Sequence, residues 1–268
     1  MKSILTKNDA YIFIAVRMKS SRLPLKAMID ISGKPLLLRL VERLSECISL
    51  DKIVICTSTH GQDDEIESFA IQHKINFFRG CEMDVMSRFI GAANKFNAKT
   101  IVRVTGDNPL TDPVVLNQMI DFHLSKKAEY TFTSGIPVGT RSEIIDVSAL
   151  NRIYGQLSDT GYSEYMTLML QRPDKLNIAE FYTNNPCIDR PELSLTVDTL
   201  EDINLIRQIY LTFDGVGVDL ADIITWLDKN PDKKIIVNKD TTLLEKVNYS
   251  FVGDWDLEDK KWIYQKYQ

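Results

Sequence analysis

The sequence predicts an α/β protein with a mostly parallel central sheet flanked by helices, and three observations carry this prediction. Short runs of β-branched and aromatic residues alternate with amphipathic helical stretches over the first two thirds of the chain. The composition is that of a globular protein, with 44% hydrophobic and 26% charged residues in a chain of 268. Loops of charged and small polar residues follow several of the predicted strands. Such alternation is typical of stacked βαβ units.

The predicted elements follow in chain order. Residues 11–15 are a β-branched and aromatic run, and Pro35 suits the first turn of a helix over 35–47. Acidic residues at 63–65 favour a helix start, because the helix dipole stabilises negative charge there. Further strands are expected at 53–56, 77–78, 100–105, 130–133, 142–146, 178–182 and 193–197. Further helices are expected at 63–73, 84–96, 113–124, 148–157, 163–170, 199–210 and 220–227.

Residues 1–230 are predicted to form one domain, followed by a Lys- and Asp-rich tail over 231–268. The tail is expected either to pack on this domain or to contact a second subunit in a homodimer. The four cysteines contain no Cys-x-x-Cys pair, and the chain has only three histidines. This pattern indicates neither a zinc site nor a disulfide framework. Cys56 is interpreted as a small core residue.

The charge pattern excludes some classes of partner. A net charge of -5 argues against general binding of nucleic acid, which depends on a basic surface. The first nine residues lack the apolar centre of a signal peptide, and no apolar run is long enough to cross a bilayer. We therefore expect a cytoplasmic protein without nucleic-acid or membrane partners, whose recognition of phosphate is local.

A basic loop follows the first predicted strand. It contains Arg17, Lys19, Arg22 and Lys26 within a short segment. Ligands of open α/β sheets bind beyond the carboxyl ends of strands, so the loop lies where a ligand would bind. Arginine grips phosphate oxygens bidentately and lysine supplies a compact charge, which together suit a triphosphate. The alternative is a solvated loop without a ligand.

Two aspartates follow predicted strands. Asp107 lies in Gly106-Asp107-Asn108-Pro109, after the strand at 100–105, and Asp198 follows the run 193–197. A carboxylate at the end of a buried strand favours a positive partner, and Mg²⁺ takes one or two protein carboxylates beside phosphates. The pair therefore predicts a Mg²⁺ site. The alternatives are a turn-forming role for Asp107 and a helix-capping role for Asp198.

These motifs resemble those of a known family. In order and at compatible spacing from about residue 12 to residue 209, they are similar to the cytidylyltransferases related to CMP-Kdo synthetase, in particular the spore coat polysaccharide biosynthesis branch. The motifs are Arg17-x-x-x-Ser21-Arg22-Leu23-Pro24-x-Lys26, Ser32-Gly33-Lys34-Pro35, Thr57-Ser58 with Asp63-Asp64, Arg79-Gly80 with Asp84-Val85 and Arg88, Arg103-Val104-Thr105-Gly106-Asp107-Asn108-Pro109, and Val197-Asp198-Thr199-Leu200-Glu201-Asp202.

The resemblance implies a Rossmann-like nucleotide-diphospho-sugar transferase fold that uses CTP and Mg²⁺ and releases pyrophosphate. It implies catalytic roles for Arg17, Lys26 and Asp107, and a Mg²⁺ site at Asp107 and Asp198. It implies nucleotide contacts from Arg17, Ser21, Arg22, Lys26, Thr57, Ser58, Arg79, Arg103 and Asp107. It implies contacts with a small-molecule acceptor from Asn108, Gly139, Glu143 and Glu164.

The chain departs from the family pattern at three positions. Leu25 stands where many relatives have glycine, Val16 separates Ala15 from Arg17, and Tyr165 replaces a histidine that often follows the equivalent of Glu164. The expected reaction is cytidylylation of an acidic sugar for a surface glycan. The alternatives are transfer to a sugar phosphate or phosphonate, giving a CDP-linked product, and a silent nucleotide-binding protein. A glycosyltransferase is disfavoured, because Asp-x-Asp occurs only as Asp254-Trp255-Asp256 in the tail.

Overall fold

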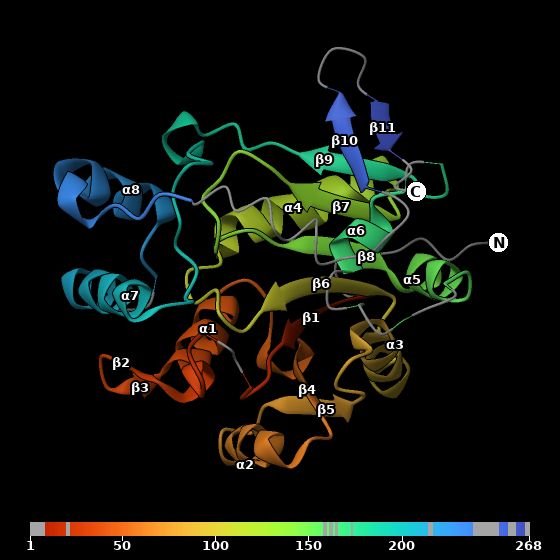
Figure 1. Ribbon diagram of the computed structural model, residues 1–268, viewed down its shortest axis with the longest axis horizontal. Coiled ribbons are helices and arrows are strands. Elements are labelled where there is room, and N and C mark those ends of the chain that lie inside the picture. The colour runs from red at the N-terminus through yellow and green to blue at the C-terminus, as the bar shows by residue number, and fades with distance from the viewer. Residues whose placement is uncertain are drawn as a thin grey trace.

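The computed structural model describes residues 9–19, 22–157, 160, 163, 166–172, 174–213 and 217–237, and the backbone of 252–256 and 261–265. A seven-stranded sheet forms the centre of the described fold, with the order β5-β4-β1-β6-β8-β7-β9 (Figure 1). Its strands are β1 (Ala10–Ala15), β4 (Ile53–Ser58), β5 (Asn76–Gly80), β6 (Thr100–Thr105), β7 (Tyr130–Thr133), β8 (Glu143–Asp146) and β9 (Ile178–Phe181).

The sheet is mostly parallel, as predicted. The strands β5, β4, β1 and β6 run parallel to one another, and β9 runs parallel to β7. Only β8 is reversed among these seven, pairing antiparallel with both β6 and β7. The strands of the first half are joined through helices, which is the connection that parallel neighbours require. The four strands of the parallel half therefore direct their carboxyl ends to one edge of the sheet.

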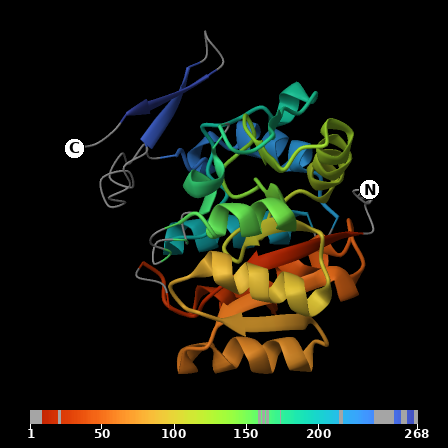
Figure 2. The same cartoon turned by 90° about the vertical axis from the view of Figure 1, so that its right-hand side faces the viewer.

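Helices cover both faces of this sheet (Figure 1 and Figure 2). Alternate strand residues face opposite layers: Ile12 and Ile14 pack into one core, and Phe13 packs into the other. This alternation follows from the two-residue period of a strand. The first core is closed by α1 (Leu36–Leu44), α2 (Asp64–Gln72), α4 (Pro113–Lys126), α7 (Leu200–Thr212) and α8 (Leu220–Lys229). The second core is closed by α3 (Val85–Phe96), α5 (Val147–Tyr154) and α6 (Met166–Leu170).

The prediction of a strand over 193–197 is wrong. Leu193 and Ser194 form only isolated bridges, to Ile236 and to Val138. Beyond them the chain runs along the loop after β6, where the Val197 N–H donates to the Asp107 carbonyl at 2.9 Å. The run is apolar because it packs in the first core, without a strand of the sheet beside it. Other elements differ at their ends, as α1 begins after Pro35, which is its N-cap residue.

The first residues of the predicted tail pack on the domain. The Val237 N–H donates to the Glu192 carbonyl, and the Ser194 N–H donates to the Ile235 carbonyl, both at 2.8 Å. Farther along, β10 (Val252–Asp256) and β11 (Lys261–Gln265) form an antiparallel pair, so Asp254-Trp255-Asp256 lies on a strand and not in an irregular segment. Among the residues that the structure describes, no helix is both long and apolar enough to cross a membrane.

Candidate active site

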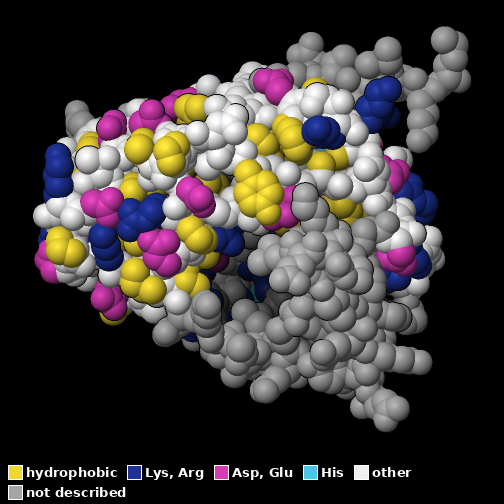
Figure 3. All heavy atoms as spheres, turned by 90° about the horizontal axis from the view of Figure 1, so that it is seen from above, with side chains coloured by type: hydrophobic (Ala, Val, Ile, Leu, Met, Phe, Trp, Pro, Cys, Tyr) yellow, Lys and Arg dark blue, Asp and Glu magenta, His cyan; other side chains and the backbone are white. Residues whose placement is uncertain are grey.

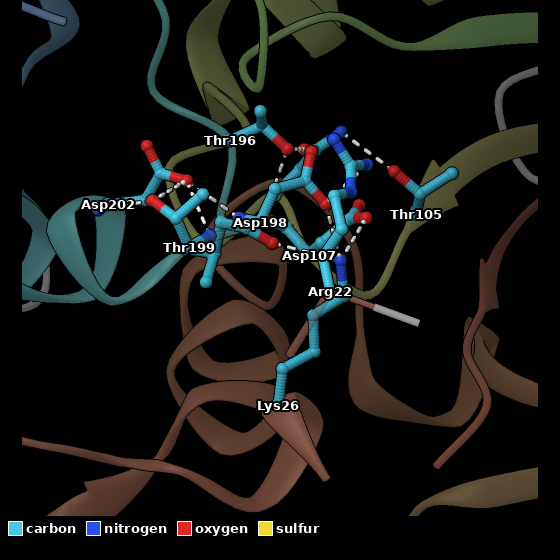
Figure 4. A network of polar contacts seen from close by, with 10 residues as sticks. Arg22, Lys26, Thr105, Asp107, Thr196, Asp198, Thr199 and Asp202 are labelled. Carbon is cyan, nitrogen blue, oxygen red and sulfur yellow. Dashed lines mark hydrogen bonds and ion pairs between the residues drawn. The ribbon is translucent and has the colours of Figure 1, made fainter. Parts of the chain in front are cut away.

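One lysine joins the two aspartates that the sequence places after strands. The Lys26 ammonium donates to Asp107 Oδ2 at 2.8 Å, to Asp198 Oδ1 at 3.0 Å and to the Val197 carbonyl at 2.9 Å (Figure 4). Arg22 adds a second cation, with its guanidinium 2.9 Å from Asp198 Oδ1. The basic loop therefore meets both carboxylates in one cluster, which we call the Lys26 cluster: Arg22, Lys26, Asp107 and Asp198.

The loop after β6 holds Asp107 in the cluster. A turn closed by the Asn108 N–H and the Thr105 carbonyl follows the strand directly. Gly106 is required at this point, because a Cβ atom there would lie 2.6 Å from a methyl carbon of Val16. The Gly106 N–H also donates to the Ala15 carbonyl at 2.9 Å. The ends of β1 and β6 are thus held side by side, and the turn-forming role predicted for this motif coexists with the ion pair.

The start of α7 directs Asp198 to the same place. Thr199 is the N-cap residue of α7, and it forms a capping box with Asp202. The Asp202 carboxylate also accepts the backbone N–H of Asp198 at 2.8 Å. The alternative in which Asp198 itself caps the helix is therefore wrong. Because a threonine satisfies the helix end, the carboxylate of Asp198 is available to Lys26 and Arg22.

Electrostatics keeps the Asp107 carboxylate charged. Burial by itself would raise the pKa of Asp107, but the Lys26 ammonium and hydrogen bonds from Lys26 and Thr105 outweigh it and lower the pKa. A carboxylate and an ammonium in direct contact each favour the charged form of the other. The Asp107 carboxylate is therefore charged beside the Lys26 ammonium at neutral pH.

The donor atoms of this cluster fit a magnesium ion. Two carboxylate oxygens and one carbonyl oxygen surround a single positive atom, and hard oxygen donors are the ligands that Mg²⁺ takes. Among the described residues no group of three or more His, Cys, Asp and Glu side chains could hold a metal. Mg²⁺ does not need such a group, because it commonly completes its shell with phosphates and water.

A cavity of about 490 Å³ opens beside the Lys26 cluster. Both aspartates of the cluster line it, as do three of the residues predicted to contact the acceptor: Asn108, Gly139 and Glu143. Asn108 donates to the Thr105 hydroxyl at 2.8 Å and accepts from the Thr196 hydroxyl at 2.9 Å, so its amide is held in a fixed orientation. Glu164, the fourth predicted residue, lies outside the described residues.

The wall of the cavity contains a partly buried ion pair. Arg103 on β6 and Glu143 on β8 face each other in the antiparallel register, 2.5 Å apart between Nη1 and Oε2. The other oxygen of Glu143 accepts from the Tyr130 hydroxyl. Burial and the Glu143 charge raise the pKa of Tyr130 well above its ordinary value, so this phenol stays protonated as a donor. Arg103, predicted to contact the nucleotide, is therefore placed with the predicted acceptor residue Glu143.

Comparison with known proteins identifies the family. The family model for cytidylyltransferases matches residues 11–213, most of the chain. The chain belongs to the cytidylyltransferase family. It is 32% identical over 233 residues to the spore coat polysaccharide biosynthesis protein SpsF of Bacillus subtilis, covering 84% of this chain and 96% of that protein. The sequence-based resemblance is thereby confirmed.

Solved structures agree with this family and its fold. A cytidylyltransferase from Leptospira borgpetersenii superposes with a TM-score of 0.77 at 26% identity, covering 84% of this chain and 96% of that one. The CMP:2-keto-3-deoxy-manno-octonic acid synthetase complexed with CTP superposes with a TM-score of 0.56 at 16% identity, covering 76% and 98%. At that identity the second likeness shows the fold alone. The Rossmann-like fold predicted for this cytidylyltransferase is confirmed.

The basic loop turns through a left-handed residue at Leu25. Leu25 has φ 61°, in the region that favours glycine, which is the residue that the family resemblance predicts at this position. Its N–H donates to the Met18 carbonyl at 3.0 Å, which closes the loop. Arg17 donates to the Glu82 carbonyl at 3.3 Å, beside β1. Ser21 lies outside the described residues.

Two of the predicted nucleotide contacts have buried side chains. Thr57 and Ser58, at the end of β4, are fully buried. The Ser58 hydroxyl donates to Asp63, and the same carboxylate accepts the N–H groups of Ser58 at 3.1 Å and of Met18 at 2.8 Å. Hydrogen bonds from Met18 and Ser58 outweigh burial and lower the pKa of Asp63. The Ser58 hydroxyl therefore serves the junction of β4 with the basic loop, and the contacts of Thr57 and Ser58 with a nucleotide stay predictions.

Arg79 has partners on every side. Its guanidinium donates to the carbonyls of Ser58 at 2.9 Å and His60 at 3.0 Å. It pairs with Glu67 at 2.5 Å and Asp64 at 2.7 Å, and its hydrogen bond to the Glu67 carboxylate is the main cause of its raised pKa. These contacts hold β5 to the end of β4 and to α2. The family resemblance implies that Arg79 contacts the nucleotide, and that contact also stays a prediction.

Gly139 has a backbone role at the cavity. It has φ 91°, and a Cβ atom there would lie 2.2 Å from the Thr196 nitrogen. Only glycine lets the loop before β8 approach the segment that leads to Asp198. Its predicted place beside an acceptor is consistent with its position on the cavity wall.

Two buried residues near the site carry roles that sequence reasoning did not assign. Asp63 joins the end of β4 to the basic loop through its bonds from Ser58 and Met18. Arg88 on α3 is buried, and its guanidinium meets that of Arg17 at the Glu82 carbonyl. Within the described ranges the Arg88 Nε has no hydrogen-bond partner. Both residues belong to motifs that carry the resemblance, which was the available signal, although no chemistry could be read from their spacing alone.

Proposed function

We propose that this cytidylyltransferase uses CTP and Mg²⁺ to cytidylylate an acidic sugar or a related acceptor for a surface glycan, releasing pyrophosphate. The observation that carries the proposal is the Lys26 cluster, which lines the 490 Å³ cavity through Asp107 and Asp198. Nucleotidyl transfer requires clamped phosphates, neutralised charge and a nucleophile held in line, with little covalent help from the protein. A basic loop, a carboxylate pair and an adjoining cavity meet those three requirements.

The relatives support the choice of nucleotide and pathway. One relative is named for spore coat polysaccharide biosynthesis, and one structural neighbour is a sugar-acid synthetase complexed with CTP. Other relatives, at 24% identity, are 3-deoxy-manno-octulosonate cytidylyltransferases. These names favour CTP over other nucleotides and an acidic sugar over other acceptors.

In the proposed reaction, an acceptor hydroxyl oxygen bonds to the α-phosphorus of CTP while the bond from that phosphorus to the bridging oxygen of the β-phosphate breaks. Pyrophosphate leaves with the electron pair of that bond, and the hydroxyl proton passes to solvent. Arg17, Arg22 and Lys26 bind the triphosphate. Lys26 already neutralises two carboxylates, so an arriving triphosphate competes with Asp107 and Asp198 for the ammonium. Asp107 and Asp198 would hold Mg²⁺, which supplies neutralisation of phosphate charge when bound. The cavity beside them receives the acceptor.

The proposal is tested by following pyrophosphate release with CTP, UTP, ATP and GTP. Each nucleotide is combined with Mg²⁺ and with a panel of ulosonic acids and sugar phosphates. We expect release with CTP and a ulosonic acid, and its loss when EDTA removes the metal. Release only with sugar phosphates would replace the acidic sugar by the alternative acceptor class.

Thermal stabilisation by CTP gives an independent measurement on the same protein. At matched Mg²⁺ concentrations, CTP should raise the melting temperature more than ATP or GTP, because only binding to the folded state stabilises it. Equal stabilisation by all four nucleotides would contradict a cytidine-specific site. Strong CTP binding without release of pyrophosphate from any acceptor would favour a silent nucleotide-binding protein.

A further inference from the structure

We infer that Arg141 is the residue that binds the anionic group of the acceptor, a carboxylate or a phosphate. The inference rests on the proposed function, because it assigns the acceptor to the cavity beside the Lys26 cluster. Arg141 lies in the loop before β8 and lines that cavity together with Asp107 and Asp198. Sequence reasoning gave this residue no role.

The charges on the cavity wall single out Arg141. Arg103 is paired with Glu143, and the two aspartates of the cluster are paired with Lys26 and Arg22. Arg141 has no ion pair with any carboxylate among the described residues, and its one hydrogen bond there is from Nε to the Ile136 carbonyl at 2.9 Å. It is therefore the cation of this wall whose counter-charge has to come from a ligand.

The backbone around Arg141 is built to hold it in place. The turn before it is closed by the Thr140 N–H and hydroxyl, which donate to the Pro137 carbonyl at 3.2 and 2.8 Å. Gly139 packs tightly on the backbone at Thr196, as described above. The bond from Nε fixes the guanidinium plane, and the two terminal nitrogens keep their four N–H donors. This is the edge that binds carboxylate or phosphate bidentately.

Burial makes an unpaired guanidinium costly. Burial lowers the pKa of Arg141, which means that the surroundings disfavour its charge. Arginine nevertheless remains protonated at neutral pH, so a partner anion offsets the cost of desolvation. A neutral sugar supplies no such charge. The cavity should therefore distinguish anionic acceptors from neutral ones chiefly through this residue.

The test compares Arg141→Gln, Arg141→Lys and the matched control Arg152→Gln. Arg152 is a partly exposed arginine on α5 that pairs with Glu129 and does not line the cavity. The acceptors are 3-deoxy-manno-octulosonate as a carboxylate, glucose 1-phosphate as a phosphate, and glucose as a neutral sugar. The initial rate of pyrophosphate release gives KM for each acceptor and for CTP.

For the acceptor that is used, Arg141→Gln should raise KM at least about 10-fold, because it removes a charge-assisted pair. KM for CTP should stay unchanged. The acceptor KM of Arg141→Lys should lie between those of the wild type and Arg141→Gln, because lysine keeps the charge but cannot bind the anion bidentately. Arg152→Gln should match the wild type. Unchanged acceptor KM in Arg141→Gln, or equal use of glucose by the wild type, would overturn the inference. Use of one anionic acceptor and not the other identifies the anion as carboxylate or phosphate.

If no acceptor leads to release of pyrophosphate, the proposed function fails. The inference is then decided by binding, measured by calorimetry with 3-deoxy-manno-octulosonate and with inorganic phosphate on the full-length protein. Binding by the wild type that Arg141→Gln loses and Arg152→Gln keeps supports the inference. Equal binding by all variants, or no binding by the wild type, overturns it.

Discussion

The carboxyl ends of β4 and β6 carry similar residues and use them differently. Beyond the end of β4, Asp63 accepts from neutral donors: two backbone N–H groups and the Ser58 hydroxyl. At the end of β6, Asp107 shares the ammonium of Lys26 with Asp198. The first carboxylate is buried, whereas the second lines a cavity.

This difference separates a structural carboxylate from one placed for chemistry. Hydrogen bonds from neutral backbone groups hold two segments of one fold together, and an incoming ligand cannot replace them without opening that junction. An ion pair at the edge of a cavity can exchange its partner for a metal ion or a phosphate. The same residue types after neighbouring strands therefore have opposite expected responses to mutation.

The largest effect is expected at the end of β6. Asp107→Asn should lower the rate of pyrophosphate release by at least about 10²–10³-fold, the typical cost of removing one electrostatic contact at a developing charge. The melting temperature should hold, because Lys26 keeps Asp198 as a partner. The control is Asp232→Asn, an exposed aspartate beside Lys233. Near-normal turnover in a folded Asp107→Asn would remove the metal assignment.

The opposite outcome is expected at the end of β4. Asp63→Ala leaves buried donors from Met18 and Ser58 without an acceptor, which should lower the free energy of unfolding by about 2–4 kcal/mol. Urea denaturation at pH 7 measures this loss. If Asp63→Ala were as stable as the wild type but unable to use CTP, the contrast between the two strand ends would be lost.

The same residue gives the comparison a pH dependence. The pKa of Asp63 is lowered in the folded protein, so its stabilising contribution is fully present above the ordinary value of 3.8. That contribution is lost as the pH falls through the lowered pKa. The difference in unfolding free energy between wild type and Asp63→Ala should therefore shrink in acid below pH 3.8. A difference that grows on acidification would reverse the sign of the argument.

A smaller effect on activity is expected from mutation of Arg22, the exposed arginine of the Lys26 cluster. The side chain of Arg22 is 66% exposed, so its ion pair with Asp198 adds little to stability. Arg22→Ala should raise KM for CTP about 10-fold through a lost charge-assisted contact with phosphate. The melting temperature serves as the control. Unchanged kinetics would support the alternative of a solvated loop for this position.

The smallest kinetic effect is expected for Arg79, whose partners belong to the fold. Arg79→Gln removes its ion pairs with Asp64 and Glu67 and should lower the free energy of unfolding by about 1 kcal/mol. KM for CTP should stay at the wild-type value. A large rise in KM with unchanged stability would instead support the nucleotide contact that the family resemblance implies.

The sequence by itself determined the layered α/β fold, the basic loop and Asp107. These follow from local patterns, because strand and helix periods are set by the alternation of apolar residues along the chain. The short distance between Lys26 and Asp107 follows from the parallel order of β1 and β6, whose carboxyl ends share one edge. Motif order over most of the chain then identified the family.

Only the tertiary structure decided which polar side chains face the cavity. Ser58 turns inward to Asp63, and Arg103 pairs across the sheet with Glu143. Asp198 pairs with Lys26 and Arg22 because Thr199, and not Asp198, caps α7. Arg141 has no carboxylate partner in the described structure, and no spacing in the sequence predicts this. Partners distant along the chain determine where a side chain points and whether its charge is already balanced, and folding alone brings those partners together.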